Sequence, residues 1–254
     1  SKYQDIFNFG KRTGVDLPGE EKGLIYTVDN MDIATLVTNA FGQNYNATMM
    51  QMAAAFSSLI NDGYYYEPHV MKKITDSSGA TVRTAEADPI KTTISASTSS
   101  AIRDMLYQTV EEGTGNKARI EGYKIGGKTG TAEKQPRDDE RYLVSFISFA
   151  PVDDPQIVLY VVIDEPNIPK QSDASQATIM TNKLYKEILP YMGSFSDIDP
   201  EPEPEPETGS AEPETGSEPE TSSTKREPQD EAWEPGWGFM GPITGTSTAE
   251  TTSQ

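Results

Sequence analysis

The clearest pattern in this sequence is an apolar stripe at helical spacing between residues 49 and 60. Apolar residues recur there at intervals of three and four, which places them on one face of a helix. Thr48 or Asn46 can cap its first turn, and Gly63 can end it. We expect this face to pack against another element. The residues expected to point inward are Met49, Met52, Ala53, Phe56, Leu59 and Ile60.

Two later stretches also predict helices. One runs from about Ser97 and stops at Gly113. The other follows Ser172, which can act as its cap, and ends at Pro190. Both have an apolar face, so both are expected to lie on a neighbouring layer. The residues expected to point inward are Ile102, Met105, Leu106 and Val110 in the first, and Ala177, Met180, Leu184 and Ile188 in the second.

Strands are predicted in three places besides the segment that carries the motif described below. One is expected from Tyr64 to Ile74. Two runs rich in β-branched and aromatic residues, Tyr142 to Ala150 and Gln156 to Ile163, flank the turn sequence 151–155 and predict a hairpin. Because both runs are apolar at nearly every position, both faces of this sheet should be covered. The predicted fold class is therefore mixed α/β, an antiparallel sheet flanked by helices.

From about residue 196 the composition changes. Residues 196–254 contain half of the chain's 18 prolines and a Glu-Pro alternation at 201–207. Such a segment buries too little apolar surface to offset the entropy lost on ordering. We therefore predict two regions, a folded domain at 1–195 and a disordered, acidic Pro/Glu-rich tail at 196–254.

Charge and composition exclude several classes of protein. The net charge is −19, and residues 197–254 hold fifteen acidic residues against Lys225 and Arg226, a net charge of −13 for the tail. No basic stripe exists, which argues against a nucleic-acid binder. The chain contains no cysteine, and we expect no metal and no organic cofactor. No apolar run is long enough to span a membrane, so the chain reads as soluble.

The most informative motif is Gly126-Gly127-Lys128-Thr129-Gly130-Thr131-Ala132-Glu133. Alternation along a strand would place the hydroxyls of Thr129 and Thr131 on one side and the ammonium of Lys128 on the other. On an exposed edge, the hydroxyls can bind a carboxylate and Lys128 adds positive potential. Gly130 lets a peptide backbone approach and pair with the strand, and the N–H of Thr131 can help stabilise an oxyanion.

The Lys-Thr-Gly triplet is shared by penicillin-binding proteins and serine β-lactamases. Over roughly residues 1 to 192 this sequence resembles the C-terminal half of a class B penicillin-binding protein transpeptidase domain, most of all the division and sporulation branch of Gram-positive bacteria. The stretches that carry the resemblance, besides the motif, are 13–20, 40–43, 52–68, 142–146 and 161–166. The resemblance implies a domain that is incomplete at the N-terminus.

In the family that it resembles, a serine is acylated by a stem peptide ending in D-Ala-D-Ala, and the acyl group passes to an amine. β-Lactams mimic the donor peptide. The resemblance implies catalytic roles for Lys128 and Thr131, and substrate-binding roles for Lys128, Thr129, Gly130 and Thr131. It also implies a location on the outer face of the cytoplasmic membrane, with the anchor in an absent N-terminal part. Partners in the division or elongation machinery are implied as well.

This sequence departs from the family pattern in two ways. It has no Ser-x-Asn, and its one Ser-x-x-Lys, Ser222 to Lys225, falls in the predicted tail. With no nucleophile identified, we expect the chain alone to be inactive, although its parent is an enzyme. Its single histidine, His69, is expected to be an ordinary exposed residue. Glu133 stands where relatives often have glutamine, which we expect to weaken binding of anionic β-lactams.

Three other interpretations stay open at this point. The motif also occurs in β-lactamases and D,D-carboxypeptidases, which hydrolyse the acyl group instead of transferring it. A non-catalytic protein can keep a peptide groove for binding or scaffolding and use its acidic tail for partners. Finally, Lys128 can simply protect an edge strand from aggregation. The upstream gene sequence discriminates between enzyme and scaffold, because an enzyme needs the two absent motifs.

Overall fold

The computed structural model describes residues 2–85, 88–136 and 139–193. All of these belong to the first of the two units into which the chain divides, Ser1–Pro202. The tail predicted at 196–254, with its Ser222 to Lys225 sequence, lies outside the described residues.

A three-stranded antiparallel sheet forms the centre of this unit. Its strands are β5 (Gly126–Glu133), β6 (Tyr142–Ala150) and β7 (Ile157–Asp164), in the order β5-β6-β7. The two apolar runs of the sequence are β6 and β7, which confirms the predicted hairpin. Its register pairs Ala150 with Ile157 and Leu143 with Asp164. The motif segment is the remaining strand, β5, at one edge of this sheet.

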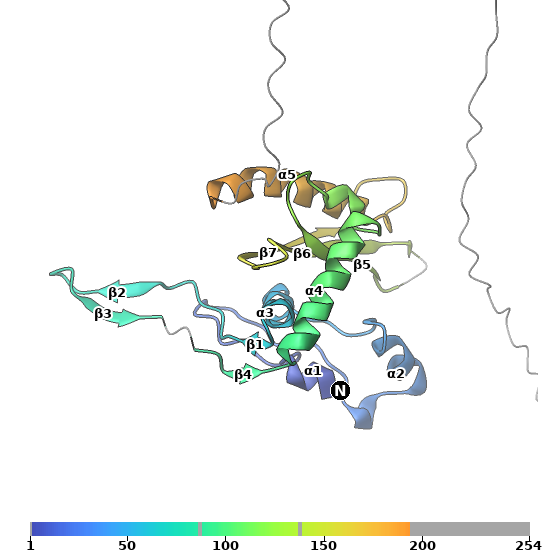
Figure 1. The fold of residues 1–254 in the computed structure, drawn as a ribbon. Helices are drawn as coiled ribbons and strands as arrows, with labels where there is room; N and C mark the ends of the chain where they lie inside the picture. Colours follow the sequence, from blue (N-terminus) through green and yellow to red (C-terminus); the bar gives the residue numbers. More distant parts are fainter. Residues whose placement is uncertain (1, 86–87, 137–138, 194–254) are drawn as a thin grey trace, which may run out of the picture. The chain divides into compact units, whose positions relative to one another are not determined.

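Side chains of β6 alternate between two apolar layers. Phe146, fully buried, belongs to a cluster with Tyr185 of α5 (Ser175–Tyr191), whereas Phe149, also fully buried, belongs to a cluster with Phe56 of α3 (Met49–Ile60). Both faces of the sheet are therefore covered, as the apolar pattern predicts. Figure 1 shows α5 along one face, with α3 and α4 (Ala96–Glu111) on the other side.

Helix α3 begins with a reciprocal cap. The Thr48 hydroxyl accepts from the backbone N–H of Gln51 at 3.1 Å, and the side-chain amide oxygen of Gln51 accepts from the backbone N–H of Thr48 at 2.9 Å. The Gln51 side chain is fully buried, and its amide donates to the carbonyls of Lys11 and Lys22. Thr48 is thus the predicted cap, and Gln51 also fixes the N-terminal segment to α3.

The inward faces of the helices differ in part from the prediction. Met49 of α3 and Met105 of α4 are exposed, and so are Met180 and Leu184 of α5. The buried face of α5 instead includes Thr178 and Thr181, along with Ala177, Tyr185 and Leu189. Each threonine hydroxyl donates to a carbonyl of the preceding turn, to Ser175 at 2.8 Å and to Ala177 at 2.9 Å. Burial of these hydroxyls therefore costs little, which hydropathy alone does not reveal.

The start of α5 also corrects the prediction. The helix begins at Ser175, and it is the carboxylate of Asp173 that accepts from the N–H of Ser175 at 2.9 Å. Ser172 therefore does not cap the helix. At the other end the helix continues through Pro190 to Tyr191.

The strand predicted from Tyr64 to Ile74 is also wrong as a single element. It is divided into β1 (Tyr64–Tyr65), which pairs with β4 (Lys91–Thr92), and β2 (Lys73–Thr75), which pairs with β3 (Thr81–Thr84). Figure 1 shows β2 and β3 as an arm that points away from the central sheet. All of its strand residues are exposed, so the arm contributes no core.

The segment before α3 and the connection from α4 to β5 contain only short elements. They are α1 (Lys2–Ile6), the 3₁₀ turn Val28–Asn30, α2 (Ile33–Asn39), and the 3₁₀ turn Asn116–Ala118. An isolated bridge between Leu24 and Asn46 brings the residues that flank α2 together. The loop that follows α2 contacts the motif strand through Gln43.

Candidate peptide-binding strand and cleft

Strand β5 lies at the edge of the sheet, and the N–H and C=O groups of alternate residues point away from β6. The side-chain amide of Gln43 donates to the carbonyl of Thr131 at 3.1 Å, so this carbonyl points away from β6. In an antiparallel strand, a residue's N–H and C=O point to the same side. The N–H groups of Thr131 and Thr129 therefore also point outward. Within the described residues, no strand pairs with this edge.

The three polar side chains of the motif lie on this edge strand in the predicted alternation. The hydroxyl of Thr129 lies 2.9 Å from that of Thr114, and the hydroxyl of Thr131 donates to the carbonyl of Ser172 at 3.4 Å. Lys128 is exposed, and its ammonium donates to the carbonyl of Thr129 at 3.0 Å. Thr129 and Thr131 thus share one side of the strand, and Lys128 takes the other.

Glycine is favoured at positions 127 and 130 of the motif for different physical reasons. A Cβ on Gly127 would meet the Phe146 ring at 2.5 Å and the backbone carbonyl of Ile147 at 2.8 Å. A Cβ on Gly130 would meet only the hydroxyl of Ser145, at 2.6 Å, which can rotate away. Gly127 is therefore required by the packing of the sheet, whereas at Gly130 only one rotatable hydroxyl opposes a larger residue.

A cavity of 660 Å³ lies at the far end of β5, next to Thr131. One wall is formed by the end of β5 and the residues just after it, and the other by the segments on either side of α2. The volume lies within the range of about 300–1,000 Å³ that is typical of ligand sites. Its lining residues are Leu24, Tyr26, Thr35, Gly42, Gln43, Asn44, Tyr45, Asn46, Ala132, Glu133, Lys134, Gln135 and Leu143.

Lys134, which lines this cavity, is paired with two carboxylates. Lys134 lies 2.6 Å from a carboxylate oxygen of Glu165 and 3.0 Å from one of Asp164. The same Glu165 oxygen is 3.4 Å from Arg141. The hydrogen bonds that Lys134 donates to Glu165 and Asp164 raise its pKa, so its charge is held by two carboxylates. Glu133, half-buried in the lining, adds a further negative charge to this region.

Tyr142 lies beside Glu133, since the two residues are partners in the β5–β6 register. Burial raises the pKa of the Tyr142 phenol, and the carboxylates of Glu133 and Glu140 raise it further. This phenol therefore stays neutral at physiological pH and can donate a hydrogen bond to Glu133. The Glu133 carboxylate is thereby held at the rim of the cavity.

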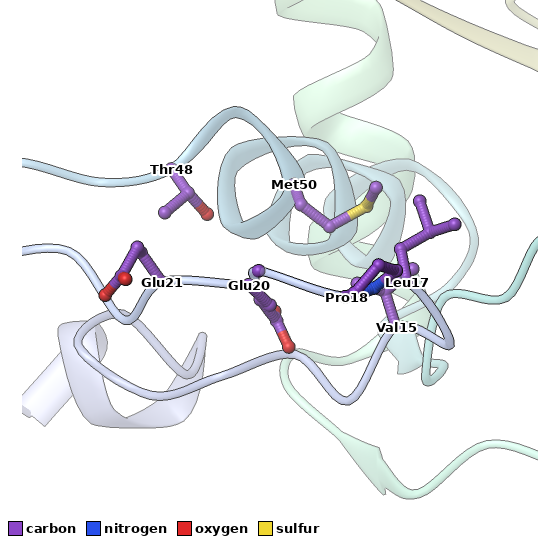
Figure 2. A pocket seen from close by; sticks show the side chains of 8 residues that line it. Val15, Leu17, Pro18, Glu20, Glu21, Thr48 and Met50 are labelled. Atoms are coloured by element: carbon purple, nitrogen blue, oxygen red, sulfur yellow. The ribbon is translucent and has the colours of Figure 1, made fainter.

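A smaller hollow of 310 Å³ lies beside the start of α3. Figure 2 shows Leu17, Pro18 and Met50 grouped at one end and Glu21 and Thr48 toward the other. The Glu20 carboxylate is engaged by the Thr13 hydroxyl at 2.6 Å and by the Gly14 N–H at 3.1 Å. Because no residue of β5 lines this hollow, it is separate from the candidate strand.

The structure brings Lys128, Thr129, Gly130 and Thr131 together on one strand. His69 lies outside helices and strands and is exposed, as the sequence suggests. Sequence reasoning assigned no site role to Gln43, which is 88 residues from its partner Thr131, nor to Thr114. Long-range pairs of this kind leave no local pattern, although residues 40–43 do belong to the stretches that carry the family resemblance.

The described part of the chain contains neither a metal-binding cluster nor a membrane-spanning helix. Among residues 2–85, 88–136 and 139–193, no group of three or more His, Cys, Asp or Glu side chains is arranged to hold a metal ion. Over the same ranges, no helix has both the length and the apolar character needed to cross a membrane.

Comparison with known families identifies the fold. The model of the penicillin binding protein transpeptidase domain matches residues 1–186. The chain therefore belongs to the penicillin-binding protein transpeptidase family, and it corresponds to the transpeptidase domain of a class B member. The mixed α/β fold class predicted from the sequence is confirmed by the solved structures of this family.

Individual relatives agree with this assignment. The chain is 38% identical over 196 residues to stage V sporulation protein D of Bacillus subtilis, covering 76% of this chain and 30% of that protein. It is 27% identical over 191 residues to the probable peptidoglycan D,D-transpeptidase PenA of Neisseria flavescens, covering 74% and 44%. Penicillin binding protein 3 of Mycobacterium tuberculosis, solved in complex with ampicillin, matches with a TM-score of 0.69 and 28% identity, covering 80% and 47%. This chain thus spans less than half the length of each of these relatives.

Proposed function

We propose that residues 1–195 form the C-terminal part of the transpeptidase domain of a peptidoglycan D,D-transpeptidase, and that β5 binds the end of a stem peptide. The observation that carries the proposal is the contact between Gln43 and the carbonyl of Thr131 at 3.1 Å. It means that the main chain of the motif strand is turned outward, where a peptide can pair with it. The family assignment and the relatives' names support the reaction class.

The polar groups of the strand suit a peptide that ends in a carboxylate. The hydroxyls of Thr129 and Thr131, which share one side of the strand, bind that carboxylate, and the ammonium of Lys128 on the other side adds positive potential. The N–H of Thr131 points outward and supplies one donor for the oxyanion that forms when the peptide carbonyl is attacked. Lys128 and Thr131 are the catalytic residues of this proposal, and Thr129 and Gly130 bind the substrate.

The nucleophile is proposed to lie outside this chain. A serine activated by a Ser-x-x-Lys motif would attack the penultimate D-alanine carbonyl, release the terminal D-alanine, and form an acyl-enzyme. An amine of a neighbouring peptidoglycan strand would then take the acyl group and release the serine. The sequence printed here supplies the motif strand but no Ser-x-Asn, so the 254-residue chain alone is proposed to be inactive.

A fluorescent penicillin tests this proposal. The longest translated product of the gene that contains this sequence should form a covalent adduct that survives denaturation, and the 254-residue chain should form none. Lys128→Met should slow labelling of the longer product about a hundredfold or more. Lys183→Met removes another exposed ammonium, on α5, and should change nothing. A denaturation-resistant adduct on the 254-residue chain would contradict the proposed inactivity.

Product analysis separates transfer from hydrolysis. With a stem peptide and an added acceptor amine, a transpeptidase gives the cross-linked product, whereas a carboxypeptidase gives only the shortened peptide. A β-lactamase would release hydrolysed penicillin and keep no adduct. A longer product with neither Ser-x-x-Lys nor Ser-x-Asn and with no labelling would instead favour a scaffolding role. Attachment to the outer face of the membrane and contacts with division proteins belong to the same proposal.

A further inference from the structure

One carboxylate ties together residues that flank all three strands of the central sheet. Lys134 follows the last residue of β5, Arg141 precedes the first residue of β6, and Glu165 follows the last residue of β7. A single oxygen of Glu165 lies 2.6 Å from the Lys134 ammonium and 3.4 Å from the Arg141 guanidinium. The three side chains are only 32% to 37% exposed, so these pairs are less screened by water than pairs on an open surface.

Main-chain hydrogen bonds hold the same corner of the sheet. The N–H of Lys134 donates to the carbonyl of Arg141 at 2.8 Å, one pair beyond the last partners of the β5–β6 register. The N–H of Glu165 donates to the carbonyl of Tyr142 at 2.9 Å. The Arg141 guanidinium also donates to the carbonyl of Gln135 at 3.0 Å. The network therefore fixes main chain as well as side chains just beyond the motif strand.

The backbone of Glu165 has a conformation that glutamate rarely adopts. Its φ is 47°, in the left-handed region. The next residue is Pro166, and a proline favours extended backbone in the residue before it. Glycine would adopt this backbone with less strain. A glutamate at such a position points to a function of its side chain.

Two residues held by this network form part of the wall of the cavity next to Thr131. Lys134 and Gln135 both line that cavity. Without the Glu165 carboxylate, Lys134 and Arg141 lose the group that joins them, and the end of β5 is held less firmly against β6. A peptide that pairs with the outer edge of β5 would then have to order this end of the strand as it binds, which lowers its affinity.

We propose that Glu165 is a positioning residue for peptide binding at β5. It acts through Lys134 and Arg141, by keeping the end of the motif strand ordered, and it contacts neither the peptide nor the reacting groups. The inference rests on the proposed function, because it requires that a peptide pairs with the outer edge of β5.

Two substitutions separate this role from a contribution to stability. Glu165→Gln keeps the size of the side chain and removes its charge. Glu165→Gly removes the side chain and relieves the backbone strain, so the urea midpoint of the 254-residue chain should stay the same or rise. Both variants should nevertheless bind N,N′-diacetyl-Lys-D-Ala-D-Ala about three- to tenfold more weakly in an amide shift titration.

Asp62→Gly is the matched control. It also removes an ion-paired carboxylate from a left-handed residue, since Asp62 has a φ of 64° and lies 3.3 Å from Arg103. Asp62 lies between α3 and β1, and its partner is on α4. This variant should bind the peptide with unchanged affinity.

Two further measurements separate local ordering from a general loss of structure. In Glu165→Gln, the amide of Lys134 should exchange its hydrogen several times faster, whereas the amides of Phe146 and Ile147 in the middle of β6 should be unaffected. In the longer gene product, the penicillin concentration that gives half-maximal acylation should rise. The maximal rate should not change, because no reacting group is altered.

Each other outcome is decisive. Peptide affinity equal to that of the unsubstituted chain in both variants, an unchanged exchange rate at Lys134, or a lower maximal acylation rate would overturn the positioning role. Weaker binding by Glu165→Gly together with a lower urea midpoint would also overturn it, because the effect would then be one of stability.

The penicillin experiment keeps the two proposals distinguishable. If the longer gene product is labelled and the variants bind the peptide like the unsubstituted chain, only the role of Glu165 is wrong. If the unsubstituted chain binds no peptide and the longer product takes no label, the proposed function is wrong, and the role of Glu165 is overturned with it.

Discussion

The side-chain amide of Gln43 donates a hydrogen bond to the backbone carbonyl of Thr131, on the outer edge of the motif strand, at 3.1 Å. An amide N–H of a side chain and an amide N–H of a peptide are equivalent donors. In this state Gln43 therefore occupies the position that the main chain of a paired peptide would take. A peptide that binds here exchanges one hydrogen bond for another.

This relationship predicts the effect of removing the Gln43 amide. Gln43→Ala should strengthen binding of an acyl-D-Ala-D-Ala peptide about two- to tenfold, because the peptide no longer has to displace the Gln43 amide from the carbonyl of Thr131. Affinity can be measured by amide shift titration of the chain. Gln4→Ala, which alters another partly buried glutamine with a side-chain hydrogen bond, to Asn39, serves as the control. Weaker binding by Gln43→Ala would mean that Gln43 itself holds the peptide.

Two glycines of the motif, Gly127 and Gly130, should respond differently to alanine. Gly127→Ala should lower the free energy of unfolding by about 1–3 kcal/mol, because the new methyl group meets a buried ring and a backbone carbonyl. Gly130→Ala should cost less, since only the Ser145 hydroxyl must rotate, yet it should weaken peptide binding by blocking approach to the strand. Urea unfolding and peptide titration measure the two effects. Equal losses of stability, or unchanged peptide binding by Gly130→Ala, would contradict this distinction.

A buried pair of hydroxyls gives a second stability prediction. Ser148 donates to the carbonyl of Leu159 at 3.1 Å, so the Tyr185 phenol, 3.1 Å from Ser148, donates to it. Ser148→Ala leaves a buried phenol without an acceptor and should cost about 1–3 kcal/mol, whereas Tyr185→Phe should cost about 1 kcal/mol. The double variant should be more stable than Ser148→Ala alone. Additive losses in urea unfolding would contradict this coupling.

The base of the β2–β3 arm should be sensitive to acid. Hydrogen bonds from the N–H groups of Val70 and Met71, at 2.7 and 2.8 Å, hold the pKa of Asp16 below its ordinary value. A lowered folded-state pKa means that this contribution to stability is complete above about pH 4 and is lost as the pH falls further. Amide shifts of Val70 and Met71 should follow the titration. Asp16→Asn should abolish this dependence; an unchanged pH profile would exclude Asp16 as its source.

The sequence predicted the parts of the fold that depend on continuous apolar runs. The hairpin at 142–163 was predicted because both of its faces are apolar, and two core clusters cover them. The buried face of α5 was missed because Thr178 and Thr181 satisfy their hydroxyls within the helix. The division of 64–74 into two strands was missed because the partners, β4 and β3, lie further along the chain.

Only the part of the candidate site that lies within the motif itself was predicted from the sequence. Strand alternation and the motif gave the arrangement of Lys128, Thr129 and Thr131. The contacts that surround them come from Gln43, Thr114 and Ser172, which lie 88, 15 and 41 residues from their partners. Such distances in sequence carry no periodic signal. The cavity beside Glu133 likewise exists only because the loop after α2 lies against the end of β5.

The central claim is that the outer edge of β5 receives the carboxylate end of a peptide, and one measurement tests it most directly. The backbone amide signals of Thr129 and Thr131 are followed in the 254-residue chain while N,N′-diacetyl-Lys-D-Ala-D-Ala is added, and then while its all-L isomer is added. The account predicts saturable shifts centred on these two amides with the D,D peptide and smaller shifts with the L,L peptide. Unchanged amides on β5, or shifts confined to another part of the chain, would contradict it.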